Sequence, residues 1–263
     1  MLRDITIGQY YPSESIIHRL DARVKFIGTV IYIVSLFLFR SFWGFLPAGL
    51  GLICIVLVAG IPFKYLLKGL KPMLFLLIFM VIMNLLVTPG EILWQWHFLK
   101  ITKEGLLSAS FMGLRLILLV MGSSLMTYTT TPNSLTAAME RIFRPLKIIR
   151  VPVHELAMMM SIALRFIPIL LEETDRIMKA QQARGADFES GNVIKRAKAM
   201  LPILVPLFIS AFRRAGDLAQ AMEARCYHGG KGRTKLHPLK YKFRDYMAYL
   251  VLAGYITGCW FIP

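Results

Sequence analysis

Two arginine residues occupy matching places in a short motif that occurs twice in the second half of the chain. Residues 180–185 read AQQARG and residues 221–226 read AMEARC, so the copies end in Ala183-Arg184-Gly185 and Ala224-Arg225-Cys226. A guanidinium group offers a planar set of N–H donors that suits the carboxylates or backbone carbonyls of a partner. Arginine is also common at helix C-termini simply because it complements the negative end of the helix dipole. The simpler explanation suffices for either arginine alone, whereas the repetition indicates a shared role.

Residue types that support catalysis do not fall into a catalytic arrangement. His154-Glu155 begins like the zinc-protease pattern HExxH, but Met158 stands where the second histidine is needed. Residues 229–232, GGKG, are too short for a phosphate-binding loop, and no GxSxG pattern surrounds Ser123, Ser124 or Ser161. We therefore expect a chain that is not an enzyme by itself and that uses no cofactor and no metal site.

The acidic residues also bear on the class of function. Glu172, Glu173 and Asp175 stand beside Arg176 and Lys179, and we interpret them as a solvated, salt-bridged helix face. The first four apolar blocks contain no acidic residue, which disfavours a proton- or sodium-coupled carrier. A self-contained secondary transporter or channel nevertheless stays an alternative, and a membrane-embedded enzyme is a weaker one.

The composition of this chain indicates the environment in which it folds. Of its 263 residues, 56% are hydrophobic, and the excess is gathered in blocks near the length that spans a bilayer. The net charge of +16 could indicate a nucleic-acid partner in a soluble protein, but in a membrane protein basic residues collect on the cytoplasmic side. The three cysteines have neither disulfide nor metal-ligand spacing. The sequence therefore predicts an integral membrane protein whose partners include the lipid bilayer and no nucleic acid.

The order of the blocks predicts an all-α, polytopic membrane protein with about five transmembrane helices. A polar lead, with an amphipathic helix starting over residues 15–23, precedes spans at about 26–39, 42–60, 72–87 and 106–126, and the last span covers about 246–261. Arg165, Pro168, Pro202 and Pro206 interrupt the apolar blocks between them, so we expect long amphipathic helices on the cytoplasmic face there. The predicted domains are 1–126, 127–242 and 243–263, with a cytoplasmic N-terminus and an external C-terminus.

Three smaller features carry expectations of their own. Residues 88–105 are expected to form an external loop, and Thr131 or Asn133 to cap a helix that Pro145 ends. Asn84 lies within a span and is expected to hydrogen-bond to another helix. For Arg115, also within a span, two interpretations stay open: a polar contact inside the protein, or a side chain that extends to the interface.

With this pattern assembled, the chain resembles, nearly end to end, the T component of energy-coupling factor (ECF) transporters. The lead GQYYPSESIIHRLDARVKF carries Ser15, His18, Leu20, Asp21 and Arg23 at matching places. The match continues through Thr130-Thr131-Pro132, Arg144-Pro145-Leu146-Lys147, Pro152, Glu155, Leu156 and Leu164-Arg165-Phe166-Ile167-Pro168. Its most specific part is AQQARGADF followed by LAQAMEARCYHGGKGRT.

The resemblance implies a coupling and scaffold subunit of an ATP-driven importer in the bacterial cell membrane. It implies two ABC-type ATPase subunits as partners, with Arg184 contacting one and Arg225 the other. It also implies a separate substrate-binding membrane S component that captures a vitamin or a metal. In this family glycine often stands where this chain has Cys226.

A methionine-rich surface is a further expectation. Met158, Met159, Met160 and Leu164 could form an adaptable apolar surface toward a membrane partner, since methionine repacks readily. Plain core packing explains the same four residues as well.

Overall fold

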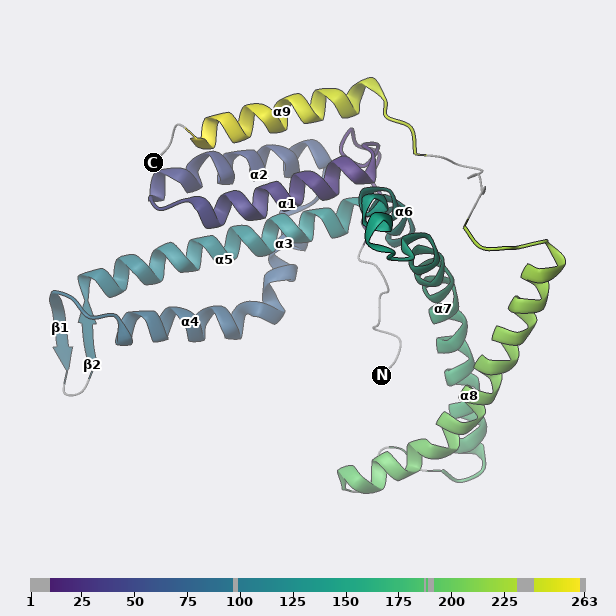
Figure 1. Ribbon diagram of the computed structural model, residues 1–263. Coiled ribbons are helices and arrows are strands. Elements are labelled where there is room, and N and C mark those ends of the chain that lie inside the picture. The colour runs from purple at the N-terminus through teal and green to yellow at the C-terminus, as the bar shows by residue number, and fades with distance from the viewer. Residues whose placement is uncertain (1–9, 97–98, 187, 189–191, 231–238, 261–263) are drawn as a thin grey trace. The chain divides into compact units, whose positions relative to one another are not determined.

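The computed structural model describes residues 10–96, 99–186, 188, 192–230 and 239–260 (Figure 1). Residues 1–9 of the lead and 231–238 of the glycine-rich basic loop, for which the sequence carries expectations, lie outside this range. The chain forms two compact units, one made of residues 6–138 with 239–263 and the other made chiefly of residues 139–238. Each unit is described by itself.

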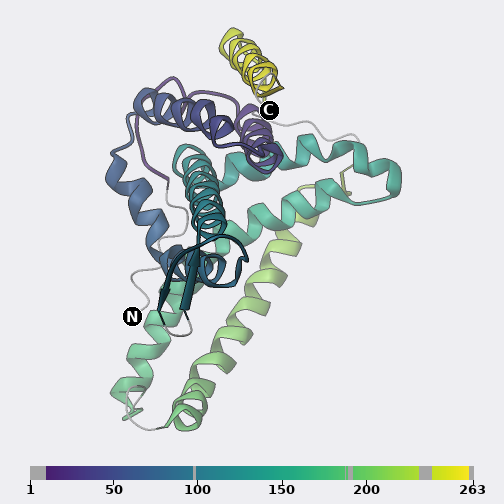
Figure 2. The ribbon, with the colours of Figure 1, turned by 90° about the vertical axis from the view of Figure 1, so that its left-hand side faces the viewer.

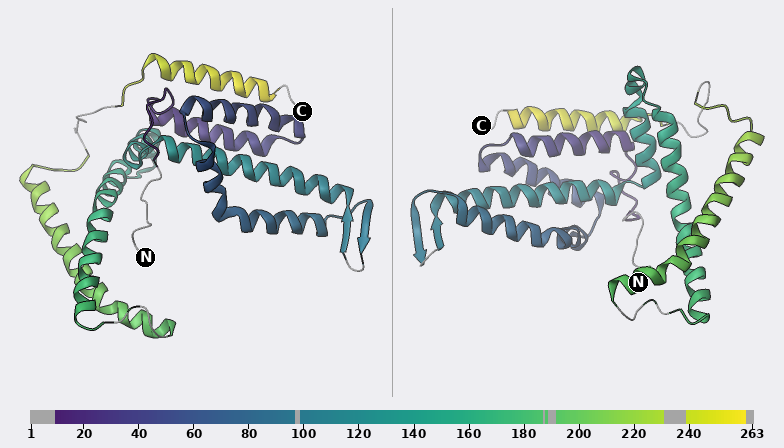
Figure 3. Two further views of the ribbon diagram at one scale, coloured as in Figure 1. Left: turned by 180° about the vertical axis from the view of Figure 1, so that it is seen from behind. Right: turned by 60° about the horizontal axis from the view of Figure 1, so that its bottom comes forward.

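The first unit is a bundle of helices built around its longest member, α5. α5 (Lys103–Thr129) packs against α1 (Ala22–Leu38), α2 (Phe45–Ala59), α3 (Phe63–Leu70) and α4 (Leu74–Val87). α9 (Phe243–Trp260) returns from the other end of the chain to lie along α1 and α2 (Figures 1 and 3). Short 3₁₀ turns, η2 (Phe42–Gly44) and η3 (Lys71–Met73), lead into α2 and α4. The predicted helical membrane fold is confirmed.

A strand pair stands where the sequence predicted an external loop. β1 (Ile92–Trp96) and β2 (Leu99–Thr102) form an antiparallel hairpin between α4 and α5, with Trp96 opposite Leu99. β2 ends at Thr102, whose hydroxyl accepts the Gly105 N–H at 3.0 Å and so caps α5. The hairpin therefore connects directly to the start of the central helix.

The bundle has a narrow apolar core and an apolar exterior. Two clusters of buried side chains lie between α5 and its neighbours; they include Leu52, Val56, Leu66 and Tyr128 in one, and Leu36, Phe45 and Leu118 in the other. On the outside, Phe75 of α4 is 82% exposed and Leu57 of α2 is 73% exposed. Large apolar side chains on an outer surface fit contact with lipid, where they are not penalised.

The second unit is dominated by two long helices that pack on each other. It contains the end of α6 (Pro132–Ile142), the 3₁₀ turn η4 (Arg144–Ile149), α7 (Val153–Ala183) and α8 (Val193–Ala224). Pro168 lies inside α7, and Pro202 and Pro206 lie inside α8. The prediction of long helices over these segments is confirmed, because each helix continues through its prolines. α8 bends part-way along its length (Figures 1 and 3), as expected where a proline removes a backbone hydrogen bond.

Among the described residues, five helices are long and apolar enough to cross a membrane, judged by length and composition: Phe42–Ala59, Phe63–Val87, Lys103–Thr129, Val153–Ala183 and Lys198–Ala224. The number agrees with the prediction, but the set differs. The last two correspond to α7 and α8, which the sequence assigned to the cytoplasmic face. α1 is 17 residues long, at the short end for a span, and α9 starts with the polar pair Arg244-Asp245.

The structure confirms some predictions about individual segments and contradicts others. The amphipathic helix over residues 15–23 was wrong: a turn occupies 16–19, and α1 begins only at Ala22, capped by Asp21. The expected cap on α6 is confirmed, since Thr131 Oγ1 accepts the Ser134 N–H at 3.3 Å. Asn84 donates to the Met80 carbonyl one turn back in α4 at 3.1 Å, so the expected bond to another helix was wrong.

Arg115 makes a polar contact inside the protein, which decides between its two interpretations. Its Nη2 donates to the Phe39 carbonyl, at the end of α1, at 2.9 Å. Its guanidinium carbon also lies 4.8 Å from the centre of the Phe111 ring. The cation is thus held by a freed helix-end carbonyl and an aromatic face, which offset part of the cost of placing it in a span.

Candidate functional site: two exposed helix ends

The first copy of the repeated motif forms the C-terminal cap of α7. Arg184 is the capping residue, and Gly185 follows it with a left-handed φ of +87°. The Gly185 N–H bonds to the Gln182 carbonyl at 2.9 Å, and the Ala186 N–H bonds to the Gln181 carbonyl at 3.0 Å. This pair of bonds defines a Schellman motif, which satisfies the last carbonyls of the helix.

The second copy forms the same cap on α8. Arg225 is the capping residue, and Cys226 has a φ of +56°. The Cys226 N–H bonds to the Glu223 carbonyl at 2.8 Å, and the Tyr227 N–H bonds to the Met222 carbonyl at 3.1 Å. Cysteine therefore follows the backbone path that glycine takes in the first copy, although a side chain makes the left-handed region less favourable.

These caps supply a physical reason for the third residue of the motif. The position after each arginine is left-handed and exposed at the tip of its helix, where a small side chain is tolerated best. The sequence alone showed that this residue was small in both copies but not that the backbone required it.

The side chains of Arg184 and Arg225 are exposed at the two helix ends. All six residues of the two motifs are exposed. Within the described part of the chain, no hydrogen bond or ion pair holds either guanidinium group. Each helix end therefore presents unused N–H donors beside small residues, an arrangement that can enter a groove on a second protein.

An ion pair joins the two helices that carry the motifs. Glu173 of α7 accepts from Ser210 Oγ and from Arg214 Nη2 of α8, both at 2.6 Å. The prediction that Glu173 is salt-bridged is confirmed, but its partner is Arg214 of α8 and not the neighbouring Arg176 or Lys179. Sequence reasoning singled out neither Ser210 nor Arg214.

The methionine-rich segment lies at the start of α7. Met159 and Met160 are 53% and 55% exposed, and Met158 and Leu164 are half-buried. Two of the four side chains thus stand open to a neighbour, and the assignment of this surface to a membrane partner remains a proposal.

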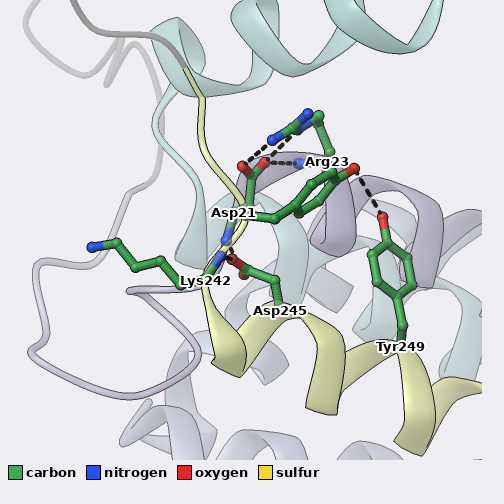
Figure 4. Close-up of polar contacts among 6 residues, drawn as sticks. Asp21, Arg23, Lys242, Asp245 and Tyr249 are labelled. Atoms are coloured by element: carbon green, nitrogen blue, oxygen red, sulfur yellow. Dashed lines mark hydrogen bonds and ion pairs between the residues drawn. The ribbon is translucent and has the colours of Figure 1, made fainter.

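The lead residues of the family pattern form a polar anchor in the first unit (Figure 4). Arg23 makes two hydrogen bonds to the Asp21 carboxylate, at 2.7 and 3.0 Å, and its guanidinium carbon lies 3.8 Å from the centre of the Tyr241 ring. The buried Asp245 of α9 accepts the Asp21 N–H at 2.9 Å and the Lys242 N–H at 2.7 Å. Burial by itself would raise the pKa of Asp21, but its hydrogen bonds from Arg23 and the nearby cations lower it. These residues tie the lead to the last helix.

Two histidines singled out by the sequence have structural partners. His18 Nδ1 lies 2.7 Å from Ser15 Oγ, and His154 Nδ1 lies 3.0 Å from Glu140 Oε1. Among the described residues, no group of three His, Cys, Asp or Glu side chains is arranged to hold a metal ion.

Known proteins resemble this chain over almost its whole length. A family model described as "Cobalt transport protein" matches residues 13–236. A curated protein of Ruminiclostridium cellulolyticum is 52% identical over 97% of this chain and 99% of its own length. Proteins of Clostridium kluyveri (54% identity, 95% of this chain, 93% of its own) and Bacillus subtilis (47%, 93% and 93%) are also similar. All three carry the name "Energy-coupling factor transporter transmembrane protein EcfT".

Proposed function

The chain belongs to the cobalt transport protein family, as a multi-pass transmembrane component of energy-coupling factor transporters, and from this premise we propose that it couples ATP hydrolysis to import. The single observation that carries the proposal is the pair of identical caps on α7 and α8. Each presents one exposed arginine whose donors are unused inside the described chain.

The proposed partners are two ABC-type ATPase subunits. Arg184 enters a groove on one of them and Arg225 a groove on the other, where carboxylates or backbone carbonyls accept hydrogen bonds. Gly185 and Cys226 let the helix tips approach closely. ATP binding and hydrolysis then change the separation of the two ATPases, and the paired helices carry that movement into the membrane.

This chain is a non-catalytic scaffold in the proposed assembly. ATP is hydrolysed in the partner subunits, and a separate S component in the membrane captures the vitamin or metal. The surface formed by Met158, Met159, Met160 and Leu164 is proposed to contact that S component, since exposed methionine side chains adapt to a moving neighbour. The N-terminus is proposed to be cytoplasmic and the C-terminus external, in a bacterial cell membrane.

Co-purification tests the proposal. A tagged chain is expressed with its two ATPases, and wild type is compared with Arg184→Glu, Arg225→Glu and the double variant. Each single reversal is expected to weaken retention of one ATPase more than the other, and the double variant is expected to lose both. Lys179→Glu and Arg213→Glu are matched controls, because they reverse exposed charges on α7 and α8 outside the motifs.

Two outcomes contradict the proposal. One is a wild-type chain that retains no ATPase, and the other is a double reversal that retains both while eluting as a folded protein in detergent. Substrate transport by the purified chain alone in vesicles would instead support a self-contained carrier.

A further inference from the structure

The ion pair between α7 and α8 lies equally far along each helix from the two arginine motifs. Glu173 and Arg214 are separated by 41 positions in the sequence, and so are Arg184 and Arg225. Ala183 ends α7 ten residues after Glu173, and Ala224 ends α8 ten residues after Arg214. At 1.5 Å per residue, each helix tip lies about 15 Å along its helix from the ion pair.

The two helices lie against each other at this point and their C-terminal ends lie apart (Figures 1, 2 and 3). The segments Glu173–Ala183 and Arg214–Ala224 therefore form two arms of equal length that start at one polar junction. We refer to Glu173, Ser210 and Arg214 as the junction.

The prolines of both helices lie on the other side of the junction. Pro168 precedes Glu173 by five residues, and Pro206 precedes Ser210 by four. Neither arm contains a proline, so the backbone hydrogen bonds of the arms run unbroken to their caps. The positions at which a proline favours a bend therefore lie before the junction, and no proline interrupts either arm.

The bonds at the junction constrain the orientation of α7 relative to α8. The Glu173 carboxylate uses both oxygens, Oε1 for the Ser210 hydroxyl and Oε2 for Arg214. Two bonds to different turns of α8 fix the rotation of one helix against the other, which a single bond does not. The Glu173 side chain is 22% exposed and that of Arg214 is 42% exposed, so water competes only in part.

We propose that Glu173, with Ser210 and Arg214, is a positioning site that sets the crossing of the two helices and thereby the spacing of Arg184 and Arg225. The proposal rests on the proposed function, in which both arginines engage ATPases at once. A rotation of 10° at the junction moves a tip 15 Å away by about 2.5 Å, which is enough to misplace a guanidinium group relative to fixed acceptors.

The distance between the two tips tests the proposal without any partner. Spin labels are placed at Gln182 and Glu223, exposed positions just before the motifs, in the full chain with its other cysteines replaced by serine. Glu173→Gln and Arg214→Ala are expected to broaden or shift the distance distribution. The charge exchange Glu173→Arg with Arg214→Glu is expected to restore it, which a general loss of folding does not explain. Glu172→Gln is the matched control, since it neutralises the exposed neighbouring carboxylate.

Simultaneous binding of the two ATPases supplies the functional measurement. The junction variants are expected to bind each ATPase alone as wild type does and to bind both together about two- to five-fold more weakly, the range of a partly exposed ion pair. An unchanged distance distribution in Glu173→Gln, or a charge exchange that restores nothing, overturns the proposal. If Glu173→Gln does not fold, Ser210→Ala removes one bond and is judged by the same criteria. A wild-type chain that binds no ATPase refutes the proposed function, whereas the distance measurement still decides whether the junction positions the tips.

Discussion

Substituting the residues that follow the two arginines should change the stability of the two helix caps in opposite directions. In Cys226→Gly, the left-handed φ of +56° is retained while the side chain that disfavours it is removed. In Gly185→Ala, a side chain is added at a φ of +87°, where a Cβ atom meets no neighbour within 4 Å. The cost of Gly185→Ala therefore arises from backbone conformation and not from a clash.

The magnitude follows from two opposing contributions. A residue with a side chain costs about 1–2 kcal/mol in the left-handed region, and glycine loses roughly 0.5–1 kcal/mol more chain entropy on ordering. The net effect is about 0.5–1 kcal/mol, in favour of glycine at both places. That free energy corresponds to about a two- to five-fold change in the opening equilibrium of each cap.

Hydrogen exchange of two amides measures this change directly. The Tyr227 N–H, which bonds to Met222, should exchange more slowly in Cys226→Gly, and the Ala186 N–H, which bonds to Gln181, should exchange faster in Gly185→Ala. Cys226→Ser keeps a side chain of similar size and should leave exchange at Tyr227 unchanged. Faster exchange at Tyr227 in Cys226→Gly would refute the reasoning, because the cysteine side chain would then be stabilising the cap.

Three further changes test the first unit, each by thermal unfolding in detergent. Asp245→Ala leaves two backbone N–H groups without their acceptor and should destabilise by about 2–4 kcal/mol, whereas Asp245→Asn, which keeps one oxygen, should cost less. Arg115→Leu removes the donor to the Phe39 carbonyl and should cost about 1.5–3 kcal/mol, and an unchanged melting temperature would show that water replaces it. Burial and the charge of Lys25 lower the pKa of His18, so the folded state binds a proton at His18 less readily than the unfolded state does. The free energy of unfolding should therefore be constant above about pH 6.5 and fall below it. His18→Gln should weaken this dependence of stability on pH.

The helices that carry the motifs were predictable because their signals are local. Long helices were predicted between residues 127 and 242, and α7 (Val153–Ala183) and α8 (Val193–Ala224) lie there and end directly before Arg184 and Arg225. A long apolar pattern, followed by charged residues and a small residue after arginine, is written within one stretch of chain. The caps depend on bonds between residues no more than five positions apart, so the same stretch fixes them.

Proline gave a misleading local signal. Pro168, Pro202 and Pro206 were expected to exclude ordinary spans, yet each lies inside a helix that is long and apolar enough to cross a membrane. Proline removes one backbone hydrogen bond and crowds the preceding turn, and a long helix packed on a neighbour can absorb that loss as a bend. The strength of that packing is a property of the folded unit and is not encoded around the proline.

The sequence by itself determined that this chain is a helical membrane protein, placed its two arginine motifs at helix ends, and carried the family pattern, since composition, periodicity and caps are properties of short segments. Only the tertiary structure decided which partners the polar residues have. Glu173 stands near Arg176 in the sequence but bonds to Arg214, 41 positions away, and Asp21 meets Asp245, 224 positions away. A charged residue on a helix surface can pair within its own helix or with another, and the choice depends on how helices cross, which no single segment specifies.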